Sequence, residues 1–284
     1  MDLVLGTAQF GQQYGITNKS EKYNNYNELE DILILLSQKG FYKLDTAQSY
    51  GDSEKMLGSI GVKDFDITSK IKLPKNLSDN KNKIIDSVGN SLINLGIDKL
   101  DCLLAHNSDF LKANKGEAIN LINSLKNNNL IDKFGISVYE PSDILDSNLL
   151  DVIQFPCNIF DHRFLTLNQS INNKMTWQCR SIFLQGILLE SFEKLPTYFT
   201  RYFDVFQNYH KNFPSLLDRM SACISFVMQQ QFQEFIVGVS CANELKDIFY
   251  SIEKHQDDLL NKNKLNGFSC EMQELIDPRL WRDN

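Results

Sequence analysis

The sequence lacks several features that would place it in whole classes of protein. Its six cysteines are scattered and include no C-x-x-C pair, so neither a zinc site nor a disulfide framework is expected. No apolar run approaches the roughly 18 residues that a membrane-spanning helix needs, and the N-terminus shows no basic leader followed by an apolar core. The net charge of −7 disfavours a general attraction to nucleic acid or anionic membranes. We therefore expect a cytoplasmic protein with reduced thiols and no metal centre.

What the sequence does contain is an alternation of short apolar runs and amphipathic segments. Hydrophobic residues make up 42% of 284, enough for a sizeable core. Strands are predicted at residues 3–6, 43–45, 65–69, 100–105, 133–137, 152–155, 181–184 and 235–239. Helices are predicted between them, for example at 27–40, 82–96 and 116–130.

This order predicts an α/β fold, a parallel eight-stranded (β/α)8 TIM barrel. No G-x-G-x-x-G follows the first strand, which counts against a Rossmann domain. The chain enters that strand almost directly, so we expect no N-terminal hairpin beneath the barrel. Without a linker-like segment, one domain over residues 1–284 is expected.

Two segments have competing interpretations. The connection at 192–213 is rich in aromatic residues, which could form a lid over a ligand. The helical spacing of Phe199, Tyr202, Phe206 and Tyr209 favours a buried helix face instead. In the run "KLPKNLSDNKNK" (72–83), bases alternate with an acid and asparagines, which is typical of a solvated loop rather than a binding patch.

Four side chains of complementary chemistry lie at the ends of three consecutive predicted strands. Asp45 ends the second strand and Tyr50 follows it after a turn; Lys70 comes at the end of the third, and His106 follows the fourth. Each alone has an ordinary explanation as a cap, a solvated charge or a polar filler. Because the carboxyl ends of barrel strands share one rim, we expect the four to converge on a site.

The four groups would form a proton-transfer site. A free tyrosine has a pKa of about 10, and a nearby ammonium such as Lys70 stabilises its phenolate. Asp45 would keep Lys70 charged, His106 could donate a hydrogen bond to a substrate carbonyl oxygen, and Tyr50 could then protonate that oxygen. Such a site lacks an electron source, so a hydride-donating cofactor fits best.

The motifs that carry these residues resemble the aldo-keto reductase superfamily over essentially the whole chain. They read, in order, "LGTAQFG", "LDTAQSYGDSE", "TSKI", "LLAHNSD", "FGIS", "IQFPCNIFDHR", "RSIFLQGILL" and "VGVSCANEL". The resemblance implies that Asp45, Tyr50, Lys70 and His106 are a catalytic tetrad with Tyr50 as general acid–base. It also implies hydride transfer from a nicotinamide held in the barrel mouth.

The resemblance further implies a set of cofactor-binding residues. These are Thr7, Ser137, Gln154, Gly186, Gly238, Ser240 and Glu244. Ser137 and Gln154 match the residues that hold the carboxamide, and Gly186, Gly238 and Ser240 match positions along the pyrophosphate and adenosine. The loop with Gln9 and Tyr14 either shapes the substrate pocket or is merely structural. At the C-terminus, Pro278 and Trp281 are expected to fold back and pack on the barrel.

Three positions depart from the family pattern. Val138 follows Ser137 where members often have asparagine, and Cys157 stands where a ring is common. The carboxylate of Glu244 would repel a 2′-phosphate and could accept a hydrogen bond from a free ribose hydroxyl. The cofactor is then NADP(H) or NAD(H), with NADH used at least as well. Alternatively, Glu244 points into solvent and Lys246 neutralises the phosphate.

We therefore expect an NAD(P)H-dependent oxidoreductase that reduces an aldehyde or ketone to an alcohol. Similar members associated with polysaccharide and sugar-nucleotide gene sets suggest a sugar-derived substrate. The alternatives are a cofactor-binding regulatory or scaffold protein with little turnover, and a lyase or epimerase that uses the tetrad for proton transfer alone. The oligomeric state does not follow from the sequence.

Overall fold

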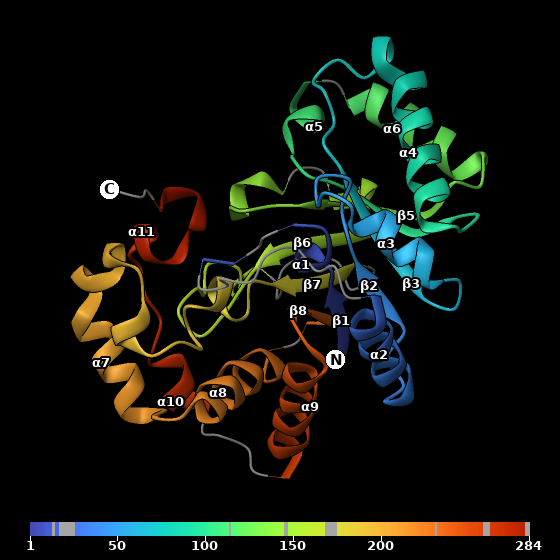
Figure 1. Cartoon of the computed structure of the whole chain (residues 1–284). Coiled ribbons are helices and arrows are strands. Elements are labelled where there is room, and N and C mark those ends of the chain that lie inside the picture. Colours follow the sequence, from blue (N-terminus) through green and yellow to red (C-terminus); the bar gives the residue numbers. More distant parts are fainter. Residues whose placement is uncertain are drawn as a thin grey trace.

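The computed structural model describes residues 1–12, 15–16, 26–113, 115–144, 147–167, 175–230, 232–257 and 262–281. Eight parallel strands close into a barrel in which every strand pairs with its neighbours in chain order and β8 pairs with β1. Helices surround the barrel, with α2, α3, α4 and α6 on one side and α7 to α11 on the other (Figure 1). The predicted (β/α)8 TIM barrel is therefore confirmed.

The strands are short and their carboxyl ends form one rim. They are β1 (Asp2–Gly6), β2 (Lys43–Asp45), β3 (Asp66–Ile71), β4 (Leu100–Ala105), β5 (Ile131–Ser137), β6 (Val152–Pro156), β7 (Thr176–Arg180) and β8 (Glu234–Gly238). Seven of them agree with the sequence prediction to within two residues at each end. In register, Asp45 of β2 pairs with Thr68, and Lys70 of β3 pairs with Leu104.

The helices are amphipathic segments that bury one face on the barrel. They are α1 (Ala8–Gly11), α2 (Tyr26–Gln38), α3 (Ser53–Ile60), α4 (Lys81–Leu95), α5 (Asp109–Ala113), α6 (Lys115–Asn127), α7 (Phe203–Asn212), α8 (Leu216–Met228), α9 (Ala242–Asp257), α10 (Lys262–Asn266) and α11 (Gln273–Ile276). In α4, Ile84, Val88 and Leu92 are buried at a spacing of four residues, and Gly96 ends the helix with a φ of 67°. None of the helices within the described ranges is long and apolar enough to cross a membrane.

The seventh strand lies at Thr176–Arg180, so its predicted position at 181–184 is wrong. The residues at 181–184 form a tight turn, in which Ser181 and Leu184 have positive φ angles of 61° and 47°. The prediction followed the most apolar run. The strand itself carries the buried polar residue Gln178, because the interior of this barrel is polar at that level.

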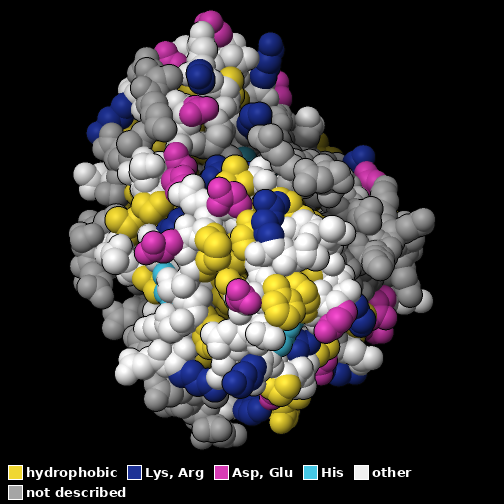
Figure 2. All heavy atoms as spheres, turned by 90° about the vertical axis from the view of Figure 1, so that its left-hand side faces the viewer, with side chains coloured by type: hydrophobic (Ala, Val, Ile, Leu, Met, Phe, Trp, Pro, Cys, Tyr) yellow, Lys and Arg dark blue, Asp and Glu magenta, His cyan; other side chains and the backbone are white. Residues whose placement is uncertain are grey.

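The aromatic connection before α8 is a packing element. Phe199 and Tyr202 lie on a 3-10 helix (Thr197–Tyr202) and Phe206 and Tyr209 on α7, and all four are buried. The ring of Phe199 lies 5.0 Å from that of Trp281, so the C-terminal segment folds back as expected. On the outer surface of this side, hydrophobic side chains are interspersed with charged ones (Figure 2). The packing interpretation therefore holds for these four rings.

Candidate active site

The side chains of Asp45, Tyr50 and Lys70 meet at the mouth of the barrel. Lys70 Nζ donates hydrogen bonds to Asp45 Oδ1, to Thr46 O at 3.0 Å and to Tyr50 Oη at 3.3 Å. Lys70 and Asp45 are 1% and 3% exposed, so their ion pair is almost dry. The ring of His106 stands edge-on to that of Tyr50, with 6.2 Å between the centroids. The four residues singled out from the sequence thus lie together.

The turn that carries Tyr50 is fixed by close backbone packing. A Cβ at Gly11 would lie 1.9 Å from Tyr50 O, so only glycine allows α1 to approach this turn so closely. Gly51 has a φ of +59°, which also favours glycine. Ser53 Oγ, at the start of α3, donates to Thr7 O at 3.0 Å and thereby ties the turn to the end of β1. Tyr50 therefore projects from a constrained loop.

Lys70 is held in its charged form. Burial alone would lower the pKa of Lys70, but the charge of Asp45, the phenol of Tyr50 and their hydrogen bonds outweigh burial and raise it. An ammonium thus lies beside the phenol oxygen at neutral pH.

His106 is held in its neutral form. Burial, together with the positive charges of Lys70 and Arg180, lowers the pKa of His106 to about 4. A neutral imidazole keeps one N–H donor and one acceptor nitrogen at neutral pH. His106 is therefore suited to donate a hydrogen bond to an oxygen without transferring a proton to it.

A chain of hydrogen bonds runs from Asp45 through the interior to the opposite end of the barrel. Gln154 Nε2 donates to Asp45 Oδ2 at 2.7 Å and to Gln178 Oε1 at 2.6 Å. Gln178 Nε2 in turn donates to Glu234 Oε2 at 2.9 Å, and Lys43 Nζ donates to Glu234 Oε1 at 2.6 Å. Both carboxylates are therefore held by one lysine and one glutamine, and the two glutamines link them.

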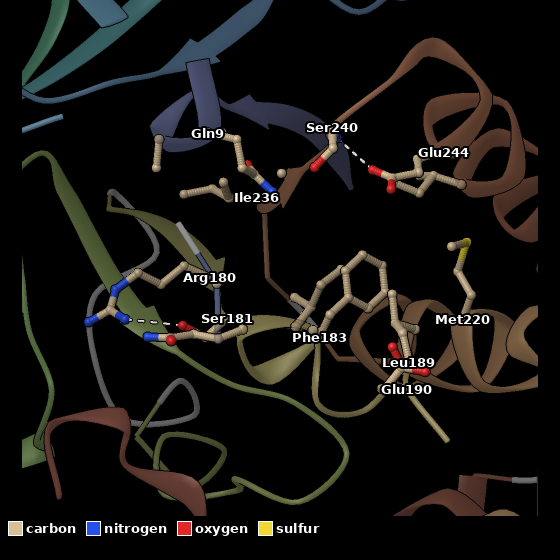
Figure 3. Close-up of a pocket in the computed structure, with 18 of the residues that line it drawn as sticks. Gln9, Arg180, Ser181, Phe183, Leu189, Glu190, Met220, Ile236, Ser240 and Glu244 are labelled. Atoms are coloured by element: carbon tan, nitrogen blue, oxygen red, sulfur yellow. Dashed lines mark hydrogen bonds between the residues drawn. The ribbon is translucent and has the colours of Figure 1, made fainter. Parts of the chain in front are cut away.

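Two cavities flank the tetrad. The first has a volume of about 740 Å³ and includes Asp45 and Tyr50 in its lining. Gln9, Ile236, Ser240 and Glu244 lie on one side of it, and Arg180, Ser181, Phe183, Leu189 and Glu190 on the other (Figure 3). The second has a volume of about 680 Å³ and includes Lys70 and His106. The candidate catalytic groups therefore lie between two spaces, and each space has room for a small ligand.

The predicted cofactor residues gather at the first cavity. Those that line it are Thr7, Gln154, Gly186, Gly238, Ser240 and Glu244. Ser137 is buried behind them, and its Oγ donates to Gln154 Oε1 at 3.2 Å. Both N–H groups of the Gln154 amide are used within the protein, so its remaining capacity is as an acceptor.

The first cavity has features that suit a dinucleotide. A Cβ at Gly238 would lie 2.4 Å from Gln9 Oε1, so any larger residue there would clash with the side chain of Gln9 at the cavity wall. Glu244 Oε2 accepts a hydrogen bond of 2.5 Å from Ser240 N while Glu244 also lines the cavity. Lys194 and Arg219 also line it; Lys194 lies 3.7 Å from Glu190, and Arg219 donates hydrogen bonds to backbone carbonyl oxygens. The donor set thus includes cations for a diphosphate and a carboxylate for a sugar hydroxyl.

Some residues of interest lie elsewhere or were missed by sequence reasoning. Tyr14 lies outside the described residues, and Cys157 is completely buried. Arg180, at the end of β7, lines the first cavity and stacks on the ring of Tyr139 at 4.2 Å. The misplaced seventh strand concealed Arg180, because a correct register would have put it at the rim. Among the described residues, no group of three His, Cys, Asp or Glu could hold a metal ion.

Comparison with known proteins assigns the family. A model of the Aldo/keto reductase family matches residues 2–260. The chain belongs to this family. Its members are oxidoreductases that act on small-molecule carbonyl compounds with a nicotinamide cofactor. A curated relative, D-arabinose 1-dehydrogenase of Saccharomyces cerevisiae, is 24% identical over 99% of this chain and 91% of its own length.

Solved aldo-keto reductases share the fold. One from Bacillus halodurans, in its holo form, has a TM-score of 0.72 and 19% identity, over 99% of this chain and 94% of its own. A putative aldo-keto reductase from Pseudomonas aeruginosa has a TM-score of 0.65 and 21% identity, over 89% of each chain. At these identities the likeness concerns the barrel and not the substrate.

Proposed function

We propose that this aldo-keto reductase is an NAD(P)H-dependent reductase of an aldehyde or ketone, with Tyr50 as the general acid. The observation that carries the proposal is the contact of 3.3 Å between Lys70 Nζ and Tyr50 Oη, with Lys70 itself paired to Asp45. A buried ammonium beside a phenol is the arrangement that proton donation from tyrosine needs at neutral pH.

Each member of the tetrad has a separate role in this proposal. Tyr50 donates its proton to the carbonyl oxygen as that oxygen gains negative charge, and the ammonium of Lys70 stabilises the phenolate that remains. Asp45 keeps Lys70 charged and is itself oriented by Gln154. Neutral His106 donates an N–H to the same carbonyl oxygen and fixes the carbonyl group in place.

The cofactor would occupy the first cavity. A nicotinamide supplies the hydride, which no amino-acid side chain can donate. Thr7, Gln154, Gly238 and Glu244 line the space that would hold it, and Ser137 supports Gln154 from behind. For the substrate we propose a sugar-derived carbonyl compound, in line with the yeast relative named above.

Replacing Tyr50 with phenylalanine tests the proposal directly. Tyr50→Phe should lower kcat about 10²- to 10⁴-fold with NAD(P)H and a panel of aldehydes, the range expected for loss of a general acid. Cofactor affinity, followed by quenching of intrinsic fluorescence, should stay within about twofold. The matched control is Tyr42→Phe, an exposed tyrosine away from both cavities, which should keep full activity.

Two results would contradict the proposal. Full activity in Tyr50→Phe would remove Tyr50 as the acid. Tight cofactor binding without turnover of any carbonyl compound would favour a regulatory or scaffold protein.

A further inference from the structure

The second cavity differs from the first in the charge of its walls. Its lining consists of Gln48, Ser49, Lys70, Ile71, Lys72, Pro74, Asn80, Lys83, Ile84, Ser87, His106 and Tyr139. Three of these residues are lysines and none is acidic, although the whole chain has a net charge of −7. The first cavity, by contrast, is lined by both acids and bases. The second cavity is therefore a positively charged space beside the tetrad.

Two of the three lysines are not neutralised. Lys70 is paired with Asp45, but Lys72 and Lys83 form no ion pair or hydrogen bond with any described residue. Other lysines of the chain do find carboxylates, as Lys99 does with Asp132 at 2.8 Å and Lys126 with Asp151 at 2.7 Å. The positive charge at Lys72 and Lys83 is thus available to a ligand.

Lys72 lies in a backbone segment that is fixed on both sides. Ile71 O accepts a hydrogen bond from His106 N at 2.8 Å. Leu73 exchanges two hydrogen bonds with the side-chain amide of Asn107, at 3.0 and 3.1 Å. Along a strand, residues two apart face the same side and lie roughly 7 Å apart. Lys72 is the first residue after β3, so it lies close to Lys70 and lines the same cavity.

Lys83, in the first turn of α4, also lines the second cavity. Gln48 Nε2 donates to Ser87 O at 3.0 Å and to Ser91 Oγ at 2.9 Å, which joins α4 to the turn that carries Tyr50. The first turn of α4 contains no acidic residue, so the helix dipole adds to the charge of Lys83 instead of offsetting it.

Tyr139, which also lines the second cavity, contacts two guanidinium groups. The ring of Tyr139 lies between two guanidinium groups, with Arg180 at 4.2 Å and Arg279 at 4.1 Å from its centroid. Arg279 is paired with Asp277 and Glu140, whereas the hydrogen bonds of Arg180 go to Ser181 Oγ and Val138 O. Arg180 thus forms no ion pair with a described residue, and its positive charge acts on His106.

We propose that Lys72 and Lys83 bind an anionic group, a phosphate or a carboxylate, carried by the carbonyl substrate. The proposal rests on the proposed function, because it takes Tyr50 and His106 as the groups that hold the carbonyl oxygen. A substrate held in this way would extend from Tyr50 and His106 into the second cavity, with its anion at Lys72 and Lys83. The substrate class is then a phosphorylated or carboxylated aldehyde or ketone.

Matched probe pairs isolate the effect of the anion. 4-Formylbenzoate is compared with its neutral methyl ester, and erythrose 4-phosphate with erythrose. In each pair, Kd is measured by calorimetry with the oxidised cofactor bound, which cannot reduce the probe, and kcat/KM by oxidation of NAD(P)H, both at low ionic strength. The anionic probe should bind and react at least about tenfold better than its neutral partner, and this ratio should fall as salt is added.

The double variant Lys72→Gln/Lys83→Gln locates the effect. In it the ratio between anionic and neutral probes should fall to about one. The control Lys63→Gln/Lys75→Gln removes the same charge from exposed lysines outside the cavity and should keep the wild-type ratio. The carboxylate and phosphate pairs show which of the two anions the site prefers.

The outcomes separate this proposal from the proposed function. Equal binding of anionic and neutral probes, or equal loss of the ratio in both double variants, overturns the anion site even if carbonyl reduction is found. A binding ratio that depends on Lys72 and Lys83, without turnover of any probe, supports the anion site and overturns the reductase.

Discussion

The protonation of His106 gives the site a specific pH dependence. With a pKa of about 4, His106 is neutral at every pH from about 5 upward. We expect no inflection from this residue in kcat/KM between pH 5 and 8. An NMR titration of the His106 ring protons, assigned with the His106→Gln variant, measures the value directly. A midpoint near 6.5 would contradict the depressed pKa.

The lowered pKa of His106 also predicts how the stability of the folded protein changes with pH. The pKa of His106 is lower in the folded protein than the usual 6.5, so only the unfolded chain binds this proton between pH 6.5 and 4. Stability from this residue is complete above about pH 6.5 and falls as the pH drops towards 4, by at most about 3 kcal/mol. Unfolding free energies of wild type and His106→Gln, compared across this range, should diverge accordingly, whereas parallel curves would exclude the effect.

Glu244 should make the enzyme use NADH at least as well as NADPH. Glu244 is exposed and lines the first cavity, and one of its carboxylate oxygens accepts a hydrogen bond from Ser240 N. A 2′-phosphate near this carboxylate would be repelled, whereas a ribose hydroxyl could donate to it. We expect kcat/KM for NADH to equal or exceed that for NADPH, and Glu244→Arg to raise the relative use of NADPH. A preference of the wild type for NADPH above about tenfold, or about 1.4 kcal/mol, would contradict this role.

Lys246 provides the matched test of the alternative, in which Glu244 points into solvent and Lys246 neutralises the 2′-phosphate of NADPH. Its Nζ lies 3.3 Å from Asn243 Oδ1, and the residue is exposed. If Lys246 neutralised a 2′-phosphate, Lys246→Gln would lower NADPH use and wild type would prefer NADPH clearly. That result would contradict the role given to Glu244.

At the scale of elements, the seventh strand shows where sequence reasoning fails. The other strands could be predicted because short apolar runs between amphipathic helices determine them. In β7, Gln178 and Arg180 interrupt the apolar pattern, since one bonds inside the barrel and the other reaches the rim. The neighbouring run at 181–184 is more apolar but adopts positive φ angles in a turn. Periodicity cannot reveal a strand whose inward side chains are polar.

The aromatic connection should matter for stability and not for catalysis. Phe206 is fully buried, and its ring lies 5.9 Å from that of Phe160. Phe206→Ala should lower the unfolding free energy by about 3–5 kcal/mol, measured by urea denaturation. The milder Phe206→Leu should leave kcat and KM within about twofold. A loss of kcat/KM in Phe206→Leu without loss of stability would instead support a lid.

At the scale of the whole molecule, the interior hydrogen-bond chain is the feature that residue-by-residue reasoning could not supply. Asp45, Lys70, Tyr50 and His106 could be predicted to meet because each lies at the end of a strand or in the turn that follows it. The hydrogen bonds of Gln154 could not be predicted in this way, because they depend on how side chains from several strands are oriented. The alternating charges at 72–83 likewise concealed two lysines that line a cavity. The assignment of all 284 residues to one domain stays a prediction.

Gln178 is the central link of this chain. Gln178→Leu leaves one N–H of Gln154 and one oxygen of Glu234 without their bonds, which should cost about 1–3 kcal/mol for each buried group. Urea denaturation measures the loss. The control is Gln230→Leu, which removes one bond to Phe226 O at the end of α8 and should cost about 1 kcal/mol or less. Equal losses of stability in the two variants would show that the interior hydrogen-bond chain contributes no more than an ordinary surface hydrogen bond.

Substitutions at the base of this barrel are consequently expected to affect the candidate active site. Lys43 and Glu234 lie at the starts of their strands, at the end of the barrel away from the candidate site, where a search for thermostabilised variants would ordinarily be thought safe. Yet a substitution there changes which way the two glutamine amides can face, and the last of them positions the acid that keeps Lys70 protonated. Variant libraries designed to stabilise this enzyme should therefore also be screened for lost activity, even when all the mutated positions lie at the N-terminal end of the barrel.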